Sequence, residues 1–188
     1  MQNGNIHPQL LDPGRLVRLV DQGREGGPIE LARLSALGLG GLVLFHLLVG
    51  LVLSGPASAT QLLSLWAIPL AMLICFPPLV LFVGLRGRRP DLQGLTALTA
   101  SGPVCTGLWL GTLSPLIALY GLTGEPNLGF GLLVVLAYVS GLAFGVRAVV
   151  QNAQALGANG PGVFVALFHA MFLAWTALVL ASRFATGG

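Results

Sequence analysis

Long runs of apolar residues alternate with short polar breaks along almost the whole chain. Each run reaches the length of about 20 residues that an α-helix needs to cross a bilayer. The breaks are rich in Gly, Pro, Asn and charged residues, which end helices or connect them. The pattern predicts five transmembrane helices, at Leu31–Ser54, Leu62–Gly84, Gly94–Gly121, Leu128–Val150 and Val163–Arg183. The expected fold class is therefore all-α, a polytopic membrane helix bundle.

These spans divide the chain into three parts. Residues 1–30 form a cytoplasmic N-terminal segment, residues 31–183 the five-span bundle, and residues 184–188 a short C-terminal tail. Two of the spans contain prolines, which remove backbone donors and kink helices. They are Pro77 and Pro78 in the second span and Pro103 and Pro115 in the third. Kinked or tilted helices are expected there.

The N-terminal segment contains a short amphipathic pattern in residues 10–24, LLDPGRLVRLVDQGR. Asp12 before Pro13 is a typical helix start, because Asp caps free N–H groups and Pro fits the first turn. Apolar residues then gather on one side of the helix, and Arg15, Arg18 and Asp21 on the other. Two roles stay open for this helix: it lies on the cytoplasmic membrane surface, or it docks on a partner subunit.

Composition supports the membrane class. Hydrophobic residues make up 55% of the 188 residues and charged residues only 8%, against about 25% charged in an ordinary soluble domain. The mean hydropathy is +0.87, and a single soluble core cannot hide so much apolar surface. The net charge of +3 raises the possibility of nucleic-acid binding. The arginines are too scattered among apolar segments to form a basic patch, so no nucleic-acid partner is expected.

The arginines are distributed asymmetrically over the connections between spans. Eight of the nine lie on alternate connections: before or at the start of the first span, in the loop GLRGRRPDLQ, and at Arg147. Positive residues stay on the cytoplasmic side, so we expect a cytoplasmic N-terminus and an external C-terminus in the plasma (bacterial inner) membrane. Arg86, Arg88 and Arg89 are interpreted as a topology signal, with a secondary contact to anionic lipid headgroups.

Two histidines lie inside spans, His46 in the first and His169 in the fifth. Two such residues are able to ligate a haem if they lie at one level in the membrane. At a rise of about 1.5 Å per residue, His46 lies about 22 Å from the inner end of its span and His169 about 10 Å from that of its own. Axial ligands of one iron lie only about 4 Å apart. The sequence therefore predicts interhelical hydrogen bonds for both histidines, and no cofactor.

Other side chains with possible chemistry have simpler interpretations. Cys75 and Cys105 reach similar depths on neighbouring spans, where they are expected to pack as buried thiols. Thr96, Thr99 and Thr106 share a face of the third span, and this face either lines a cavity or bonds to the next helix. The spans contain no Asp, Glu or Lys, which disfavours an ion-coupled transporter. No sequence motif of a catalytic or metal site is present, so neither is expected.

Small residues at helical spacing predict close helix packing. Glycines occur four residues apart at Gly107 and Gly111 in the third span and at Gly141 and Gly145 in the fourth. The fifth span repeats alanine at the same interval, at Ala166, Ala170 and Ala174. Pairs of small residues four apart allow helix backbones to approach closely. Some of these pairs are expected to close the bundle, and others to contact a partner.

Two longer stretches resemble the Yip-domain (Ypt-interacting) family of five-span membrane proteins. They are GRRPDLQGLTALTASGPVCTGLWLGTLSPLIALYG, a basic loop leading into a small-residue span with proline, and LAYVSGLAFGVRAVVQNAQALG before the last apolar span. The resemblance covers roughly residues 30–183 and concerns hydropathy and small residues. It implies the five-span fold only. The acidic and tyrosine-rich stretches of eukaryotic members are missing, so it implies no GTPase partner and no functional residue.

These features predict a non-enzymatic integral membrane protein that acts as a scaffold, an assembly factor or a subunit of a larger membrane complex. Its expected partners are the lipid bilayer and other membrane protein subunits or further copies of itself. The alternative is a small permease or channel-like transporter lined by the threonine face of the third span. A haem-binding electron carrier ranks third.

Overall fold

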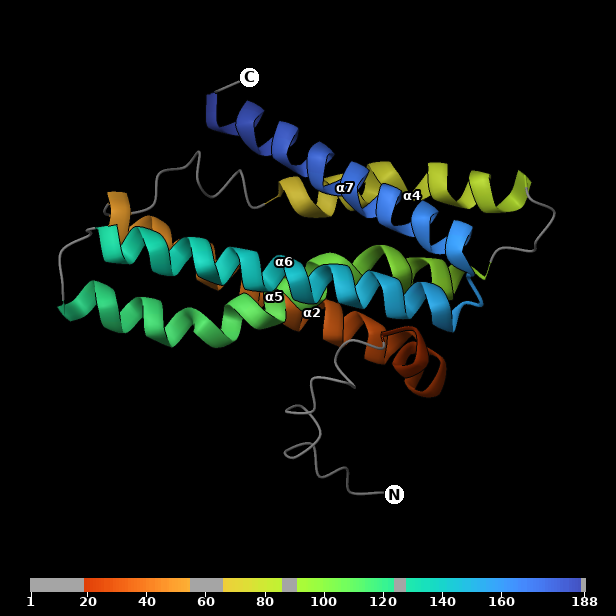
Figure 1. Cartoon of the computed structure of the whole chain (residues 1–188), viewed down its shortest axis with the longest axis horizontal. Helices are drawn as coiled ribbons and strands as arrows, with labels where there is room; N and C mark the ends of the chain where they lie inside the picture. Colours follow the sequence, from red (N-terminus) through yellow and green to blue (C-terminus); the bar gives the residue numbers. More distant parts are fainter. Residues whose placement is uncertain (1–18, 55–65, 86–90, 124–127, 187–188) are drawn as a thin grey trace.

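The computed structural model describes residues 19–54, 66–85, 91–123 and 128–186. These residues form the helices α2 (Leu19–Ser54), α4 (Ala67–Leu85), α5 (Leu92–Thr123), α6 (Leu128–Ala155) and α7 (Gly160–Thr186) (Figure 1). The prediction of an all-α polytopic bundle is therefore confirmed. Four helices are long and apolar enough to cross a membrane, over Gly26–Val52, Leu92–Thr123, Leu128–Ala155 and Gly160–Arg183.

The second predicted span corresponds to α4, which covers Ala67–Leu85 and whose apolar part covers Ala67–Leu81. The predicted span begins at Leu62, and residues 62–65 lie outside the described part of the chain. The other helices extend beyond their predicted spans. For example, α6 continues from Val150 to Ala155, because Gln151, Asn152 and Gln154 are compatible with a helix although they end the apolar run.

The one break within a described helix occurs at Gly27 in α2. Its dihedral angles are φ 73° and ψ −171°, a backbone conformation that glycine adopts without steric cost. Pro28 then starts the long membrane helix, where its missing N–H is not needed. The kinks expected at the prolines of the second and third spans do not break α4 or α5. Residues 10–18 of the predicted amphipathic helix lie outside the described residues, and the chain is helical from Leu19.

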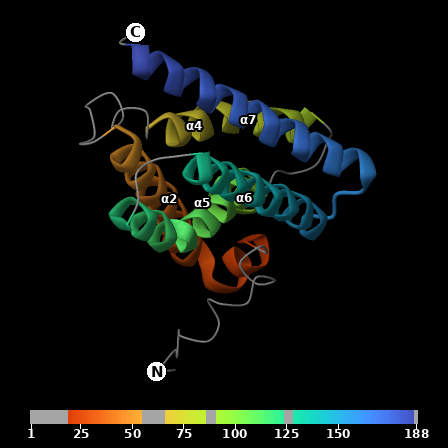
Figure 2. The same cartoon turned by 60° about the vertical axis from the view of Figure 1, so that its left-hand side comes forward.

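Helix α5 is the centre of the bundle. It makes its most extensive contacts with α2 and the next most extensive with α6. Gly38 of α2 faces Val104, and Val52 faces Gly121, so α2 and α5 run parallel. Figures 1 and 2 show α4 and α7 as a second layer over α2, α5 and α6, and α4 packs mainly against α7. The core is therefore a group of three helices, with a helix pair laid on one side.

Consecutive helices alternate in direction, as successive membrane crossings require. Gly145 of α6 packs on Gly102 of α5, and Tyr120 of α5 contacts Phe130 at the start of α6, so these two helices are antiparallel. Leu34 and Ala148, the neighbours of Arg33 and Arg147 in the sequence, pack in one cluster with Ala97 near the start of α5. The two arginines consequently lie in the half of the bundle where α4 ends and α5 begins. Arg183 lies toward the other end. This agrees with the alternation that the arginine pattern predicts.

Two end motifs fix the helices at the arginine-bearing end. Asp91 caps α5, because its Oδ1 accepts a hydrogen bond from the Gly94 N–H at 3.0 Å. Gly157 follows α6 with φ 78°, and its N–H donates to the Gln154 carbonyl at 2.8 Å. The Ala158 N–H donates to the Ala153 carbonyl at 3.0 Å. Together these bonds form a Schellman motif, which turns the chain from α6 into α7.

Candidate functional site: contacts between the helices

Glycines allow α2 and α5 to touch backbone to backbone. A Cβ atom on Gly38 would lie 2.6 Å from the carbonyl oxygen of Val104. A Cβ on Gly41 would clash with the Gly107 carbonyl, and one on Gly111 would lie 2.9 Å from the Cα of Gly41. Gly107 and Gly111 thus lie at a close contact whose other side is α2 of the same chain.

The second glycine pair closes the contact between α5 and α6. A Cβ on Gly145 would clash with Oγ1 of Thr106 and would lie 3.0 Å from the Gly102 carbonyl oxygen. A Cβ on Gly141 would lie 3.3 Å from the Thr106 methyl group. Thr106 also donates a hydrogen bond from Oγ1 to the Gly141 carbonyl at 3.1 Å. Both glycine pairs are thus used in contacts inside the bundle.

The alanine repeat of α7 is used over only part of its length. Ala166 is buried in a cluster with Leu98, Val149 and Ala153, and Ala170 packs against that cluster. Ala174 is exposed. The first two alanines therefore hold α7 against α5 and α6, whereas the third lies on the outer surface.

His46 forms a polar link between α2 and α6. Its Nδ1 lies 2.8 Å from the Leu42 carbonyl oxygen, and its Nε2 lies 2.8 Å from the Tyr138 hydroxyl. A carbonyl only accepts, so Nδ1 carries the proton of the neutral ring, and Nε2 accepts the hydrogen bond that Tyr138 donates. Phe45 packs edge-on against the Tyr138 ring at 5.4 Å between centroids. The predicted interhelical hydrogen bond of His46 is present.

Replacing Tyr138 with phenylalanine is expected to destabilise the folded chain by about 1 kcal/mol, because it leaves Nε2 of His46 without its donor inside the bundle. Unfolding in mixed detergent micelles measures this change. The control is Thr112→Val, since Thr112 is exposed and bonds only to the Trp109 carbonyl of its own helix. Equal stability of the Tyr138→Phe variant and the parent chain would show that the hydrogen bond contributes nothing.

His169 links α7 to the threonine face of α5. Thr99 donates from Oγ1 to the Leu95 carbonyl at 3.0 Å, so its oxygen is left to accept from Nε2–H of His169 at 3.4 Å. Thr96 is exposed and donates to the Leu92 carbonyl. Among the described residues, every buried side-chain oxygen and nitrogen has a hydrogen-bond partner. The threonine face therefore serves helix packing.

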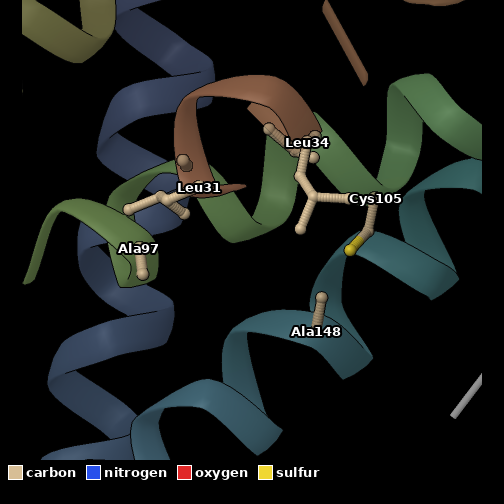
Figure 3. Packing of buried hydrophobic residues seen from close by; sticks show 7 residues of the cluster. Leu31, Leu34, Ala97, Cys105 and Ala148 are labelled. Atoms are coloured by element: carbon tan, nitrogen blue, oxygen red, sulfur yellow. The ribbon is translucent and has the colours of Figure 1, made fainter. Parts of the chain in front are cut away.

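The two cysteines are buried, form no disulfide and lie in different parts of the bundle. Cys75 packs with Ala71 and Leu173, where α4 meets α7, and its Sγ lies 3.7 Å from Oγ1 of Thr176. Cys105 lies in the cluster that joins α5 to α2 and α6 (Figure 3). The expectation of buried thiols is met, but similar depth does not bring the two residues into one cluster.

The histidines likewise take part in separate contacts. His46 bonds to α6 and His169 to α5, and both ring nitrogens of His46 are engaged. Within the described ranges, no three His, Cys, Asp or Glu side chains come together as a metal site would require. The arrangement ties helices together and offers no pair of ligands facing one central atom.

Several contact residues carry no recognised motif and were not found from the sequence. Trp109 donates from its indole nitrogen to Ser140 Oγ at 2.8 Å and stacks on Phe144 at 4.4 Å between ring centroids. Gly38 and Gly41 were missed although the first span contains the run GLGG, Gly38 to Gly41. Glycines three apart on one helix were a readable signal for a close contact.

Comparisons of the chain with protein-family models, with curated proteins and with solved structures give no match. The resemblance to Yip-domain proteins therefore stays a prediction that rests on hydropathy and small residues alone.

Proposed function

We propose that this chain is a non-enzymatic integral membrane protein that acts by packing against other membrane proteins, as a scaffold, assembly factor or subunit. The proposal rests on where the polar and the apolar side chains lie, inside the bundle or on its outward faces. Among the described residues, every buried side-chain oxygen and nitrogen has a hydrogen-bond partner, either in its own helix or in a neighbouring one. The outward faces are apolar and broad, and chemistry at such faces is limited to contact with lipid or another protein.

The hydrogen bonds of the polar side chains also argue against the permease alternative. A permease needs polar groups that are free to bind a solute along its path. The hydroxyls of α5 donate instead to backbone carbonyls: Thr106 to Gly141, Ser101 to Leu98 and Ser114 to Leu110. Those of Ser101 and Ser114 are buried as well. These hydroxyls of α5 therefore already have hydrogen-bond partners within the bundle.

One outward face has the composition of a protein contact. Helix α7 exposes large aromatic residues and a methionine in a row, with 45% to 70% of each side chain accessible. They are Phe164, Phe168, Met171, Phe172 and Trp175. Aromatic residues and methionine are enriched in protein interfaces relative to other surfaces, and large rings gain contact energy even in lipid, where the hydrophobic effect is absent.

The proposed location is the plasma (bacterial inner) membrane, with the N-terminus cytoplasmic and the C-terminus outside. The arginines at the end of the bundle shared by Arg33 and Arg147 support this orientation. A reporter that is active only in the cytoplasm, fused to Gly188, is expected to give no signal. A strong signal from that fusion would require an even number of crossings and would contradict the proposal.

The mass of the particle extracted in mild detergent tests the proposed function. We expect a particle heavier than the 19.4 kDa of one chain after the detergent contribution is subtracted. The double variant Phe168→Ala/Trp175→Ala is expected to shift it toward the single chain. Leu136→Ala on α6 is the matched control, because Leu136 is similarly exposed at 65%. A parent chain that extracts as a single copy would return the permease to first place.

A further inference from the structure

Two exposed arginines belong to one layer of the bundle, although they lie far apart in the sequence. Arg33 precedes Leu34 on α2, and Arg147 precedes Ala148 on α6. Leu34 and Ala148 are members of one buried cluster, together with Cys105 of α5 (Figure 3). Both arginines are exposed, so their side chains leave the same layer toward the outside of the bundle.

Neither guanidinium group is neutralised by the described part of the chain. No ion pair or hydrogen bond joins Arg33 or Arg147 to another described side chain, whereas Arg183 at the other end has a polar or electrostatic interaction. An unpaired charge next to hydrocarbon is costly and normally finds a partner. Both guanidinium groups are therefore available to bind an anionic ligand at that layer.

Each arginine stands at the end of an apolar strip on the membrane surface of its helix. On α2, Leu37 and Leu44 are exposed and lie on the same side as Arg33, four and eleven residues along the helix. On α6, Ala143 and Leu136 are exposed and lie on the same side as Arg147, four and eleven residues before it. The strips continue toward the opposite end of the bundle without another described charge. Helices α2 and α6 thus each present an arginine at one end of a row of exposed apolar side chains.

We propose that Arg33 and Arg147 bind the phosphate groups of anionic phospholipids in the leaflet at this end, with the acyl chains lying along the two strips. The guanidinium group binds phosphate oxygens through two parallel hydrogen bonds. A phospholipid carries both the phosphate and the apolar chains that this surface matches, whereas an acidic protein segment matches the charges alone. The two sites hold the bundle at a defined depth in the leaflet, independently of any partner protein.

Lipid titration tests this proposal on the full chain. Detergent-purified protein is titrated with phosphatidylglycerol, and bound lipid is counted by native mass spectrometry, with phosphatidylcholine as the neutral comparison. Each arginine near an anionic headgroup contributes about five-fold in affinity, so Arg33→Gln/Arg147→Gln is expected to weaken phosphatidylglycerol binding about five-fold at each of the two sites. Arg183→Gln is the matched control at the other end and is expected to leave binding unchanged. The pair Arg33→Lys/Arg147→Lys, which keeps both charges, is expected to retain most of the binding.

Four results would overturn the proposal. In the first, the glutamine pair binds phosphatidylglycerol as tightly as the parent chain. In the second, Arg183→Gln weakens binding as much as the glutamine pair does. In the third, inorganic phosphate displaces the lipid at equal concentration, which would assign the arginines to free phosphate. In the fourth, the glutamine pair binds lipid as the parent chain does, but the particle extracted from the membrane loses mass. That result would assign the two arginines to an acidic partner protein. If the glutamine pair does not extract as folded protein, the lysine pair still decides, because weak binding by that pair contradicts a charge-based site.

Discussion

Replacing Gly107 with leucine is expected to prevent the chain from accumulating as folded protein in the membrane. A Cβ atom at this position would clash with the carbonyl oxygen of Gly38 and would lie 3.1 Å from Cβ of Leu42. Neither atom belongs to the end of a flexible side chain, so the two helices have to separate. Separation removes the most extensive helix contact in the bundle, and we expect a loss of about 3 kcal/mol or more. Protein level in the membrane fraction and a single gel-filtration peak measure the outcome.

Gly40→Leu is the matched control for this substitution. Gly40 lies between Gly38 and Gly41 on α2, but no atom lies within 4 Å of a Cβ built there. The leucine would face the surroundings of the bundle, and it favours a helix more than glycine does. We expect normal accumulation. If Gly107→Leu accumulated as well as Gly40→Leu, the close approach of α2 and α5 would be wrong.

The two glycines of α6 are expected to differ in the same assay. At Gly145 the added atom would meet Thr106 and the Gly102 carbonyl, whereas at Gly141 it would meet only side-chain atoms, at 3.3 to 3.5 Å. Alanine should therefore be better tolerated at Gly141 than at Gly145. These variants report on folding of the single chain rather than on association between chains.

Phe45→Ala is expected to give the second large effect, a loss of about 3 kcal/mol in the stability of the folded chain. Phe45 is fully buried, and it packs in the cluster that joins α2 to α5 and α6 with Leu110 and Phe130. Removing the ring leaves a cavity where these helices meet and removes the edge-on contact with Tyr138. Unfolding in mixed micelles of detergent and SDS measures the loss.

The neighbouring residue supplies the control, because Leu44 is 49% exposed on the outer side of α2. Leu44→Ala exchanges one lipid-facing apolar side chain for a smaller one, and lipid fills the space. Its stability should lie within about 0.5 kcal/mol of the parent chain. Similar losses for Phe45→Ala and Leu44→Ala would mean that α2 is rotated relative to the described packing.

Most of the fold follows from the lengths of the apolar runs. The start of α6 at Leu128 and the close contact at Gly107 were both predicted, because span length and small-residue spacing depend only on local sequence. The helix ends were less predictable. Polar residues such as Gln154 end an apolar run without ending the helix, since the backbone hydrogen bonds continue into the headgroup region.

The hydrogen-bond partners of the polar residues could be predicted in part from the depth of each residue in its predicted span. By the same rise of about 1.5 Å per residue, Tyr138 lies about 18 Å from the inner end of its predicted span, close to the level of about 22 Å found for His46. The pairing of His46 with Tyr138 was therefore within reach. Depth alone fails for Cys75 and Cys105, because it gives the level of a residue but not the rotation of its helix. The rotation is set by which neighbour each face packs against, and this is a property of the whole bundle.

The pairing of α4 with α7 has a consequence for how the chain assembles during synthesis. The principal neighbour of α4 begins at Gly160, roughly 75 residues after α4 ends. At about 5 to 20 residues per second, the ribosome needs about 4 to 15 seconds to deliver it. Within this interval α5 and then α6 are completed, so that α2 and α5 come together through their glycines before α7 is made. Helix α4 therefore waits in the membrane while the three-helix core forms, and α7, which is made later, gives α4 its place.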